Sequence, residues 1–271
     1  MPDGFFSIFE LLVNALFLAS GFYIYIALTR QIASRAPVPP DAEQKTFGLP
    51  DVVLAVALAT LFTVNAVASP PRADKLVLGT NDLIANALVS VALLTFVAAF
   101  LTLRGRNVSA MAGFIKLPFW RSLMTAGILL FAAYPLIFIA DLVTQRVIGG
   151  PSSKQNIVEL FSGSPTLQQR VVIIILAVGI APLVEEFVFR FFLYGVVRRY
   201  LGRFIGLISN AALFAAVHAH VPSAAPLFVL GACFTIAYEW SGSIVVPMTM
   251  HALFNSMTLV ALAFPEHFPQ Q

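Results

Sequence analysis

The sequence predicts an all-α fold, a polytopic membrane helical bundle of about eight transmembrane helices. Hydrophobic residues make up 59% of the chain and charged residues only 11%, and the mean hydropathy is +0.89, far from the balance of soluble domains. The apolar residues also fall into runs of about 20, the length that a helix needs to cross the hydrocarbon of a bilayer. We therefore expect an integral, multi-pass membrane protein, placed in the plasma membrane if the source is bacterial.

The charge distribution limits the partners that the protein can bind, and the cysteine content limits the disulfides that it can form. The formal net charge is +3, and the basic residues are spread over short loops, whereas a nucleic-acid surface needs a concentrated basic patch. We expect the lipid bilayer as a partner and no nucleic acid, and the sequence does not indicate an oligomeric state. Cys233 is the only cysteine, which excludes an intramolecular disulfide, and it is expected in the core.

The N-terminal part of the chain predicts four spans, at residues 5–28, 51–68, 83–103 and 122–143. The first is read as a retained span, because MPDGFFSIFE has neither the basic region nor the small-residue cleavage site of a signal peptide. Prolines mark residues 29–50 as a linker, and residues 104–121, which mix basic with aromatic side chains, predict an amphipathic surface segment. The loop 144–166 is better explained as a connector than as a lid.

The last third predicts four more spans, at residues 167–200, 203–218, 226–240 and 243–264. The first is too long for one straight span, and Pro182 predicts a kink because proline removes a backbone hydrogen bond. Glu239, near the end of the seventh span, is expected at the membrane interface. The chain thus divides into four N-terminal spans with their loops (1–166), a core of about four helices (167–264) and a short tail (265–271).

The loops favour one orientation in the membrane. Basic residues are most frequent after the first, third and fifth spans. Because loops rich in lysine and arginine stay on the cytoplasmic side, both termini are expected outside.

Three charged residues stand inside the fifth span: Glu185, Glu186 and Arg190. A charge in the middle of a bilayer costs at least a few kcal/mol, so such residues need a partner and usually have a function. Glu186 and Arg190 are four residues apart and are expected to form an ion pair, which on its own can be purely structural. Glu185 is rotated by about 100° on the helix, which leaves it free to act as a general base.

Two further polar clusters lie in later spans: His218, and His251 with Asn255. Counted from the turn near Leu201, Glu185 and His218 lie about 24 and 25 Å along neighbouring antiparallel helices, which matches their depths. His251 counts to a position about 10 Å short of that depth. Each histidine alone is as well explained by helix packing, but the matched depth of the first two clusters favours one site.

The residue types allow two versions of hydrolytic chemistry, and the sequence does not choose between them. In the first, Glu185 and His218 activate a water directly. His251 and Asn255 then stabilise the oxyanion of the tetrahedral intermediate. In the second, Glu185, His218 and His251 bind a metal ion, zinc by the type and number of ligands, and Glu186 is the base. Serine nucleophiles without a neighbouring base in the sequence are the weaker alternative: Ser209, Ser243 and Ser256.

The three clusters together resemble the motifs of the CPBP family, the CAAX prenyl protease and bacteriocin-processing proteins, also called Abi. In the order of the family, EExxxR matches Glu185, Glu186 and Arg190, FxxxH matches Phe214 and His218, and HxxxN matches His251 and Asn255. The match covers residues 167–263 and departs from the family pattern at Phe191, where many members have glycine.

This resemblance implies an all-helical intramembrane endopeptidase whose catalytic residues are the matched glutamates, arginine, histidines and asparagine. Its substrate would be a peptide or a lipidated protein, cleaved near the C-terminus or in a leader. A prenylated substrate is not implied, because many bacterial members act on other peptides.

Two other classes of function would keep the same residues. Glutamate and histidine chains inside membranes also carry protons, which would make the protein a proton-coupled transporter or relay. That function predicts further ionisable residues in the first four spans, where little beyond Glu10 is found. A non-catalytic membrane scaffold would keep the fold for binding a partner, and the complete motif set disfavours it.

Overall fold

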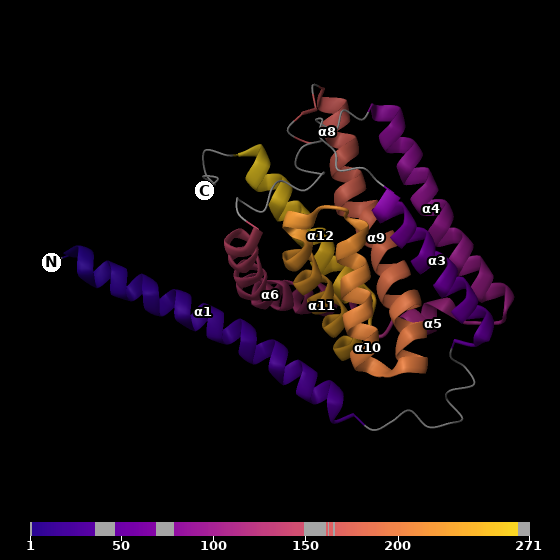
Figure 1. Cartoon of the computed structure of the whole chain (residues 1–271), viewed down its shortest axis with the longest axis horizontal. Coiled ribbons are helices and arrows are strands. Elements are labelled where there is room, and N and C mark those ends of the chain that lie inside the picture. Colours follow the sequence, from indigo (N-terminus) through magenta and orange to yellow (C-terminus); the bar gives the residue numbers. More distant parts are fainter. Residues whose placement is uncertain are drawn as a thin grey trace.

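The computed structural model describes residues 2–35, 47–68, 79–148, 161, 163–164 and 166–264, without the side chains of residues 2–8 and 148. Most of the predicted linker, most of the loop 144–166 and the tail 265–271 lie outside these residues. Within them, every regular element is a helix (Figure 1). The predicted all-α class is confirmed.

The elements in chain order are α1 (Pro2–Ala33), α3 (Leu49–Ala68), α4 (Thr80–Leu103), α5 (Val108–Ala112), α6 (Phe119–Ile148), α8 (Leu167–Ile174), η1 (Ile175–Ile180), α9 (Ala181–Glu186), η2 (Phe187–Leu193), α10 (Tyr194–Val217), η3 (Val221–Ser223), α11 (Ala224–Ser241) and α12 (Val245–Ala263). η1 and η2 are π-helical, and η3 is a 3₁₀ turn.

Seven of the described helical stretches are long and apolar enough to cross a membrane. The longest, Leu167–Val217, folds back on itself at Gly202. Its φ of 85° and ψ of 169° interrupt the helix, and glycine adopts a positive φ without steric cost. The two arms are the predicted fifth and sixth spans, so these stretches make eight crossings. The polytopic membrane bundle is therefore confirmed, and the chain is an integral, multi-pass membrane protein.

The described residues at the ends of the loops rich in basic residues gather at one end of the bundle, in the lower part of Figure 1. Arg203, beside the hairpin turn, donates to the backbone oxygen of Ile32 at the end of α1 at 3.1 Å. Asp51, buried near the start of α3, pairs with Arg104 just after α4. The ends of the first, third and fifth spans thus lie on the same side. The orientation of this side in the membrane stays a prediction.

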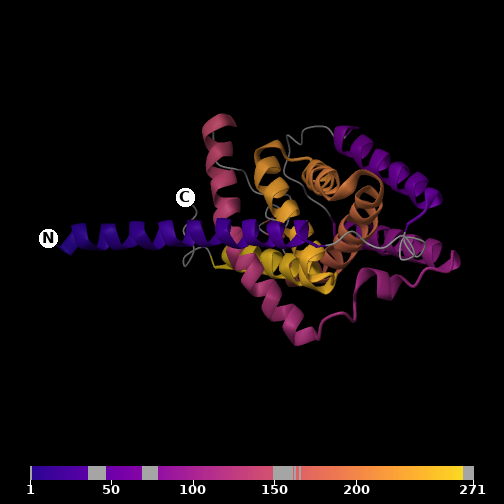
Figure 2. The ribbon, with the colours of Figure 1, turned by 90° about the horizontal axis from the view of Figure 1, so that it is seen from below.

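α1 is the outlying helix of the bundle. From Phe17 onward it packs on α6, where the rings of Phe17 and Phe131 lie 5.0 Å apart and Tyr25 donates to the backbone oxygen of Leu129 at 2.9 Å. Its N-terminal half lies beside no other described helix (Figures 1 and 2). The large exposed apolar side chains there include Leu11, Leu12 and Leu16. In a membrane protein this half faces lipid or another protein.

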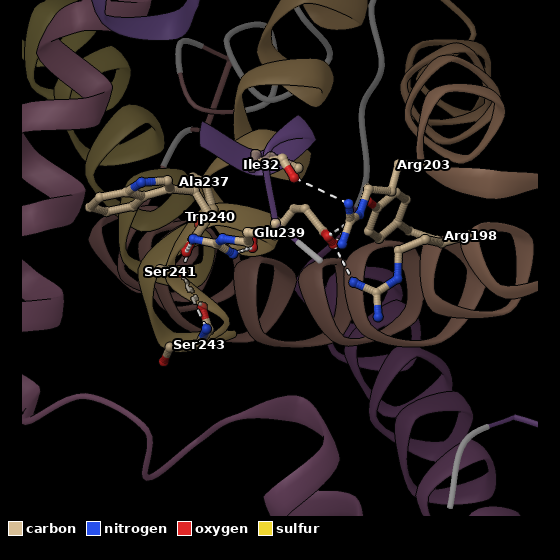
Figure 3. Close-up of polar contacts among 10 residues, drawn as sticks. Ile32, Arg198, Arg203, Ala237, Glu239, Trp240, Ser241 and Ser243 are labelled. Carbon is tan, nitrogen blue, oxygen red and sulfur yellow. Dashed lines mark hydrogen bonds and ion pairs between the residues drawn. The ribbon is translucent and has the colours of Figure 1, made fainter. Parts of the chain in front are cut away.

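Glu239, near the end of α11, holds the basic end together (Figure 3). Its carboxylate accepts hydrogen bonds from Tyr194 and Arg203, both at 3.0 Å, and from Arg198. Arg35, beyond the end of α1, donates to the backbone oxygen of Glu239 at 2.8 Å. Glu239 is only 8% exposed, and its expected position at the membrane interface stays a prediction. Two cations and a phenol replace the water that its carboxylate loses on burial.

A close backbone contact fixes the turn between α11 and α12. Gly113, just after α5, has a φ of 74°, and a Cβ added to it would lie 2.0 Å from the backbone oxygen of Gly242. Beside this contact, the N–H of Ile244 donates to the backbone oxygen of Ala112 at 3.0 Å. The predicted surface segment 104–121 therefore also packs inward and sets the start of α12, the helix that carries the third motif.

We predict that Gly113→Ala destabilises the protein by about 2 kcal/mol or more, because the Cβ displaces backbone and the positive φ is unfavourable for alanine. Cys233 is the only cysteine and is buried, so unfolding can be followed by a thiol-reactive dye during heating. Gly127→Ala is the matched control, since a Cβ there meets nothing within 4 Å, and its melting temperature should stay unchanged or rise. Equal melting temperatures of the two variants would contradict this packing.

Candidate active site

The two glutamates lie on α9, a short helix between the π-helical segments η1 and η2. π-helical segments are rare in proteins, and those that occur often lie at functional sites. The sequence predicted a kink at Pro182, and the structure shows a change of hydrogen-bond register beside it. At the end of η1, the N–H of Ala181 bonds to the oxygen of Leu176, five residues back. In that register Ala177 would need residue 182 as its donor, and proline has no N–H.

Asn255 supplies the hydrogen bond that Pro182 cannot make. Its Nδ2 donates to the backbone oxygen of Ala177 at 2.7 Å, from α12 to η1. A buried carbonyl without a donor costs about 1–3 kcal/mol, so this bond ties the asparagine of the third motif to the helix of the first. An amide nitrogen carries two N–H groups, and only one of them is needed for this bond.

Glu186 joins the first motif to the third. Its side chain is fully buried, Oε1 lies 2.9 Å from Nδ1 of His251, and Oε2 lies 3.1 Å from Nε of Arg190. The expected ion pair with Arg190 is present. The contact with His251 was not expected, because residue counting along upright helices placed His251 about 10 Å too shallow. α12 crosses the bundle obliquely (Figure 1), so such a count does not give its depth.

These contacts fix the orientation of the His251 ring. An ionised carboxylate accepts hydrogen bonds and does not donate them, so next to an ionised Glu186, Nδ1 of His251 would carry the hydrogen in their bond. Nε2 is then the ring atom that remains to act on another molecule. A carboxylate that holds one nitrogen of a histidine and leaves the other for chemistry is a recurrent arrangement in enzymes.

Arg190 is fully buried, and three aromatic rings surround its guanidinium. The Cζ atom lies 4.2 Å from the ring centroid of Phe214, 5.2 Å from that of Phe234 and 5.9 Å from that of Phe189. The contact with Glu186 is not aligned as a hydrogen bond, and Nη1 and Nη2 have no hydrogen-bond partner among the described residues. The ion pair and the aromatic faces together compensate the buried cation.

Phe214 brings the second motif into the same cluster. Its ring centroid also lies 4.8 Å from that of His218 and 6.0 Å from that of His251. His218 follows the last residue of α10, and its Nδ1 lies 2.7 Å from the backbone oxygen of Phe214. The FxxxH spacing thus places one ring against Arg190 and both histidines, and uses the same residue's carbonyl to orient His218.

Glu185 differs from Glu186 in its contacts. It is half-buried, and its Oε2 is buried without a hydrogen-bond partner among the described residues. Its charge acts on Arg190, but less strongly than that of Glu186. Its pairing with His218 stays a prediction. Glu185 is therefore the less engaged of the two neighbouring carboxylates.

Sequence reasoning missed a buried amide that supports η2. Asn210 on α10 donates to the backbone oxygen of Phe189 at 2.6 Å and accepts from the hydroxyl of Thr235 on α11 at 3.2 Å. These two bonds connect three helical elements around the segment that carries Arg190. An asparagine inside an apolar span was the signal that could have revealed it, since such residues often bond across helices.

The serines considered as nucleophiles have other contacts. Ser209 donates to the backbone oxygen of Ile205, and Ser256 to that of Ala252, both at 2.7 Å within their own helices. The hydroxyl of Ser243 is buried without a hydrogen-bond partner in the described part of the chain. These bonds pair none of the three with a histidine or carboxylate.

The predicted metal ligands do not form a metal-binding group in this structure. Across the described residues, no three His, Cys, Asp or Glu side chains stand in an arrangement that could hold an ion. Nδ1 of His251 is bonded to Glu186, and Nδ1 of His218 lies against the oxygen of Phe214. These bonds leave Nε2 of both rings available, as in metal-bound histidines, so a metal ion bound by Glu185, His218 and His251 stays a prediction.

The fold and the site define a polytopic membrane protein with a buried centre of carboxylates, histidines and one arginine. Residues 167–257, which contain all three motifs, match the family of type II CAAX prenyl endopeptidases, Rce1-like. The predicted resemblance to the CAAX protease family is thereby confirmed.

One curated relative supports the same family. The membrane-embedded CAAX protease MroQ of Staphylococcus aureus (strain USA300) is 26% identical over 129 residues, which cover 45% of this chain and 51% of MroQ. The chain thus matches about half the length of this relative. No solved structure matches the chain.

We predict that the loss in free energy of unfolding caused by Asn255→Ala depends on Pro182. In the otherwise unchanged protein, the substitution leaves the oxygen of Ala177 without its donor and should cost about 1–3 kcal/mol. In a Pro182→Ala background, the new N–H of residue 182 can bond to that oxygen, and the cost should fall by about 1 kcal/mol.

Thermal unfolding of the four proteins of this cycle, followed at Cys233, measures the coupling. Ser256→Ala is the matched control on the same helix, because Ser256 bonds only within α12, and its cost should be the same in both backgrounds. If the losses in unfolding free energy of the Pro182 and Asn255 substitutions are strictly additive, Asn255 does not replace the hydrogen bond that Pro182 lacks.

Proposed function

We propose that the protein is an intramembrane endopeptidase of the CAAX protease type. It would hydrolyse a peptide bond near the C-terminus or in the leader of a membrane-associated protein or peptide. The match to the family over the three motifs supports the reaction class. The observation that carries the proposal is the unequal engagement of two neighbouring carboxylates: Glu186 is held between Arg190 and His251, and Glu185 has an unpartnered oxygen.

In the proposed reaction, Glu185 removes a proton from a water with the help of His218, and the water oxygen attacks the carbonyl carbon of the scissile bond. The carbonyl oxygen becomes an oxyanion. Nε2 of His251, in its protonated form, and the second N–H of Asn255 would donate hydrogen bonds to it. Collapse of the tetrahedral intermediate breaks the C–N bond, and the proton taken up by Glu185 passes to the leaving amine.

The second glutamate has a supporting role in this proposal. Glu186 orients His251 through Nδ1 and balances its charge when the ring is protonated, and Arg190 holds Glu186 in turn. Asn255 would position its amide by its bond to η1. These groups are fixed before the substrate binds, so their dipoles need no reorganisation during the reaction.

We predict that Glu185→Gln lowers the rate of cleavage by a factor of about 10²–10⁴, the usual loss for a general base, without changing the melting temperature. The assay uses purified protein in bilayers and fluorogenic peptides of CAAX and leader type, both with and without a prenyl group. Glu10→Gln, which removes the carboxyl group of the first span, is the control and should keep full activity. A Glu185→Gln variant with undiminished activity would refute the assignment.

The same proteins separate the alternative functions. A proton relay would give proton uptake into vesicles that is lost in both Glu10→Gln and Glu185→Gln, with no peptide cleaved. A scaffold would show neither activity.

We also predict that cleavage survives chelation, because the proposed chemistry uses a directly activated water. Treatment with 1,10-phenanthroline should leave the rate unchanged, and elemental analysis should find less than one zinc per protein. Loss of activity on chelation that zinc restores would show instead that Glu185, His218 and His251 close around a metal ion, with Glu186 as the base.

A further inference from the structure

A cavity of about 350 Å³ lies outside the candidate active site, between α3 and the two arms of the helical hairpin. Its walls are almost wholly apolar and include Val52, Ala55, Ala59, Val197 and Leu213. None of the residues assigned to the proposed reaction lines it. Leu193, the lining residue nearest in sequence to Glu186, lies about 10 Å further along the helix.

Two polar side chains that line the cavity are already bonded. Ser209 donates to the backbone oxygen of Ile205 at 2.7 Å, and Asn210 to that of Phe189 at 2.6 Å. A polar ligand would therefore find few partners in the cavity and would lose hydration on entering it. An apolar chain has no polar groups whose hydration would be lost.

The cavity opens toward the surroundings of two membrane-spanning stretches, Leu49–Ala68 and Leu167–Val217. Val56, Tyr200 and Leu201 line it and are exposed, whereas Leu193 is buried. A chain that enters between the exposed residues would reach the buried end. At this depth of a bilayer, the apolar molecules at high concentration are the acyl chains of lipids.

The mouth of the cavity carries a cation. Tyr200 and Leu201 directly precede the Gly202 turn, at the end of the bundle where the basic loops meet. Arg199 is exposed, and its guanidinium lies 5.6 Å from the ring centroid of Tyr200. An arginine beside an apolar cavity at the end of a span complements a lipid phosphate above its acyl chain.

We propose that this cavity is a binding site for an anionic phospholipid, with one acyl chain inside and the phosphate at Arg199. This lipid site is separate from the proposed peptide site, but the two sites are connected through Asn210. Asn210 lines the cavity and holds the backbone of η2, the segment that carries Arg190. The bound acyl chain fills the space beside Asn210, the residue that holds η2.

The test compares two lipids with identical acyl chains, phosphatidylglycerol and phosphatidylcholine, in native mass spectrometry of the purified full chain. The unchanged protein should retain phosphatidylglycerol about fivefold better, the preference that one surface arginine supplies. Arg199→Gln should abolish this preference. Ala59→Phe, which fills the cavity, should reduce retention of both lipids by at least about tenfold.

Ala57→Phe is the matched control, because Ala57 is exposed on the same helix and does not line the cavity. It should bind both lipids like the unchanged protein. Thermal unfolding at Cys233 shows that each variant is folded. A phosphatidylglycerol with a photoreactive group in its acyl chain should label residues 52–59 and 193–213, and Ala59→Phe should remove this label.

Three results would overturn the proposal. The first is equal retention of the two lipids by the unchanged protein. The second is unchanged retention and labelling in Ala59→Phe. The third is displacement of the photoreactive lipid by farnesol at concentrations where excess phosphatidylglycerol has no effect, which would assign the cavity to an isoprenoid chain.

Discussion

The carboxylate of Glu186 is the group on which the candidate site depends. It lies fully buried between Arg190, four residues along its own helix, and His251 on α12. One carboxylate thus compensates a buried cation and selects the nitrogen by which a histidine can act. Removing it would leave Arg190 with the aromatic rings and the weaker influence of Glu185, and His251 without an orienting partner. It would also remove the difference in contacts on which the proposed role of Glu185 as the base rests.

The neighbouring helices hold this carboxylate in place. Asn255 bonds η1 to α12, and Asn210 bonds η2 to α10. Both amides bond to carbonyls of the π-helical segments that flank the two glutamates, where the regular α-helical register is absent. The first half of the chain contributes at the basic end, where Gly113 sets the start of α12 and Arg35 contacts the end of α11. The region without motifs therefore supports the region that carries them.

Much of this architecture could be predicted from the sequence, because helix length, charge and spacing in a membrane leave few alternatives. Runs of about 20 apolar residues predict the spans, and the four-residue spacing of Glu186 and Arg190 predicts their ion pair. The contact between Glu186 and His251 could not be predicted, because it depends on the tilt of α12. Nor could the register change beside Pro182, since a missing N–H predicts a local break without saying which side chain replaces it. The ion pairs of Glu239 with Arg198 and Arg203 could not be predicted either, because the two arginines come from another helical hairpin.

The central claim is that Glu186 holds Nδ1 of His251, and nitrogen NMR of the histidine rings tests it most directly. The protein would be labelled with ¹⁵N-histidine and ¹³C-glutamate, placed in bilayers, and assigned with His251→Gln. We expect a protonated Nδ1 in His251 with a through-space contact to a glutamate carboxyl carbon, and the loss of this contact in Glu186→Asp, which removes the labelled carboxyl carbon at position 186. An unprotonated Nδ1, or a contact that persists in Glu186→Asp, would contradict the account.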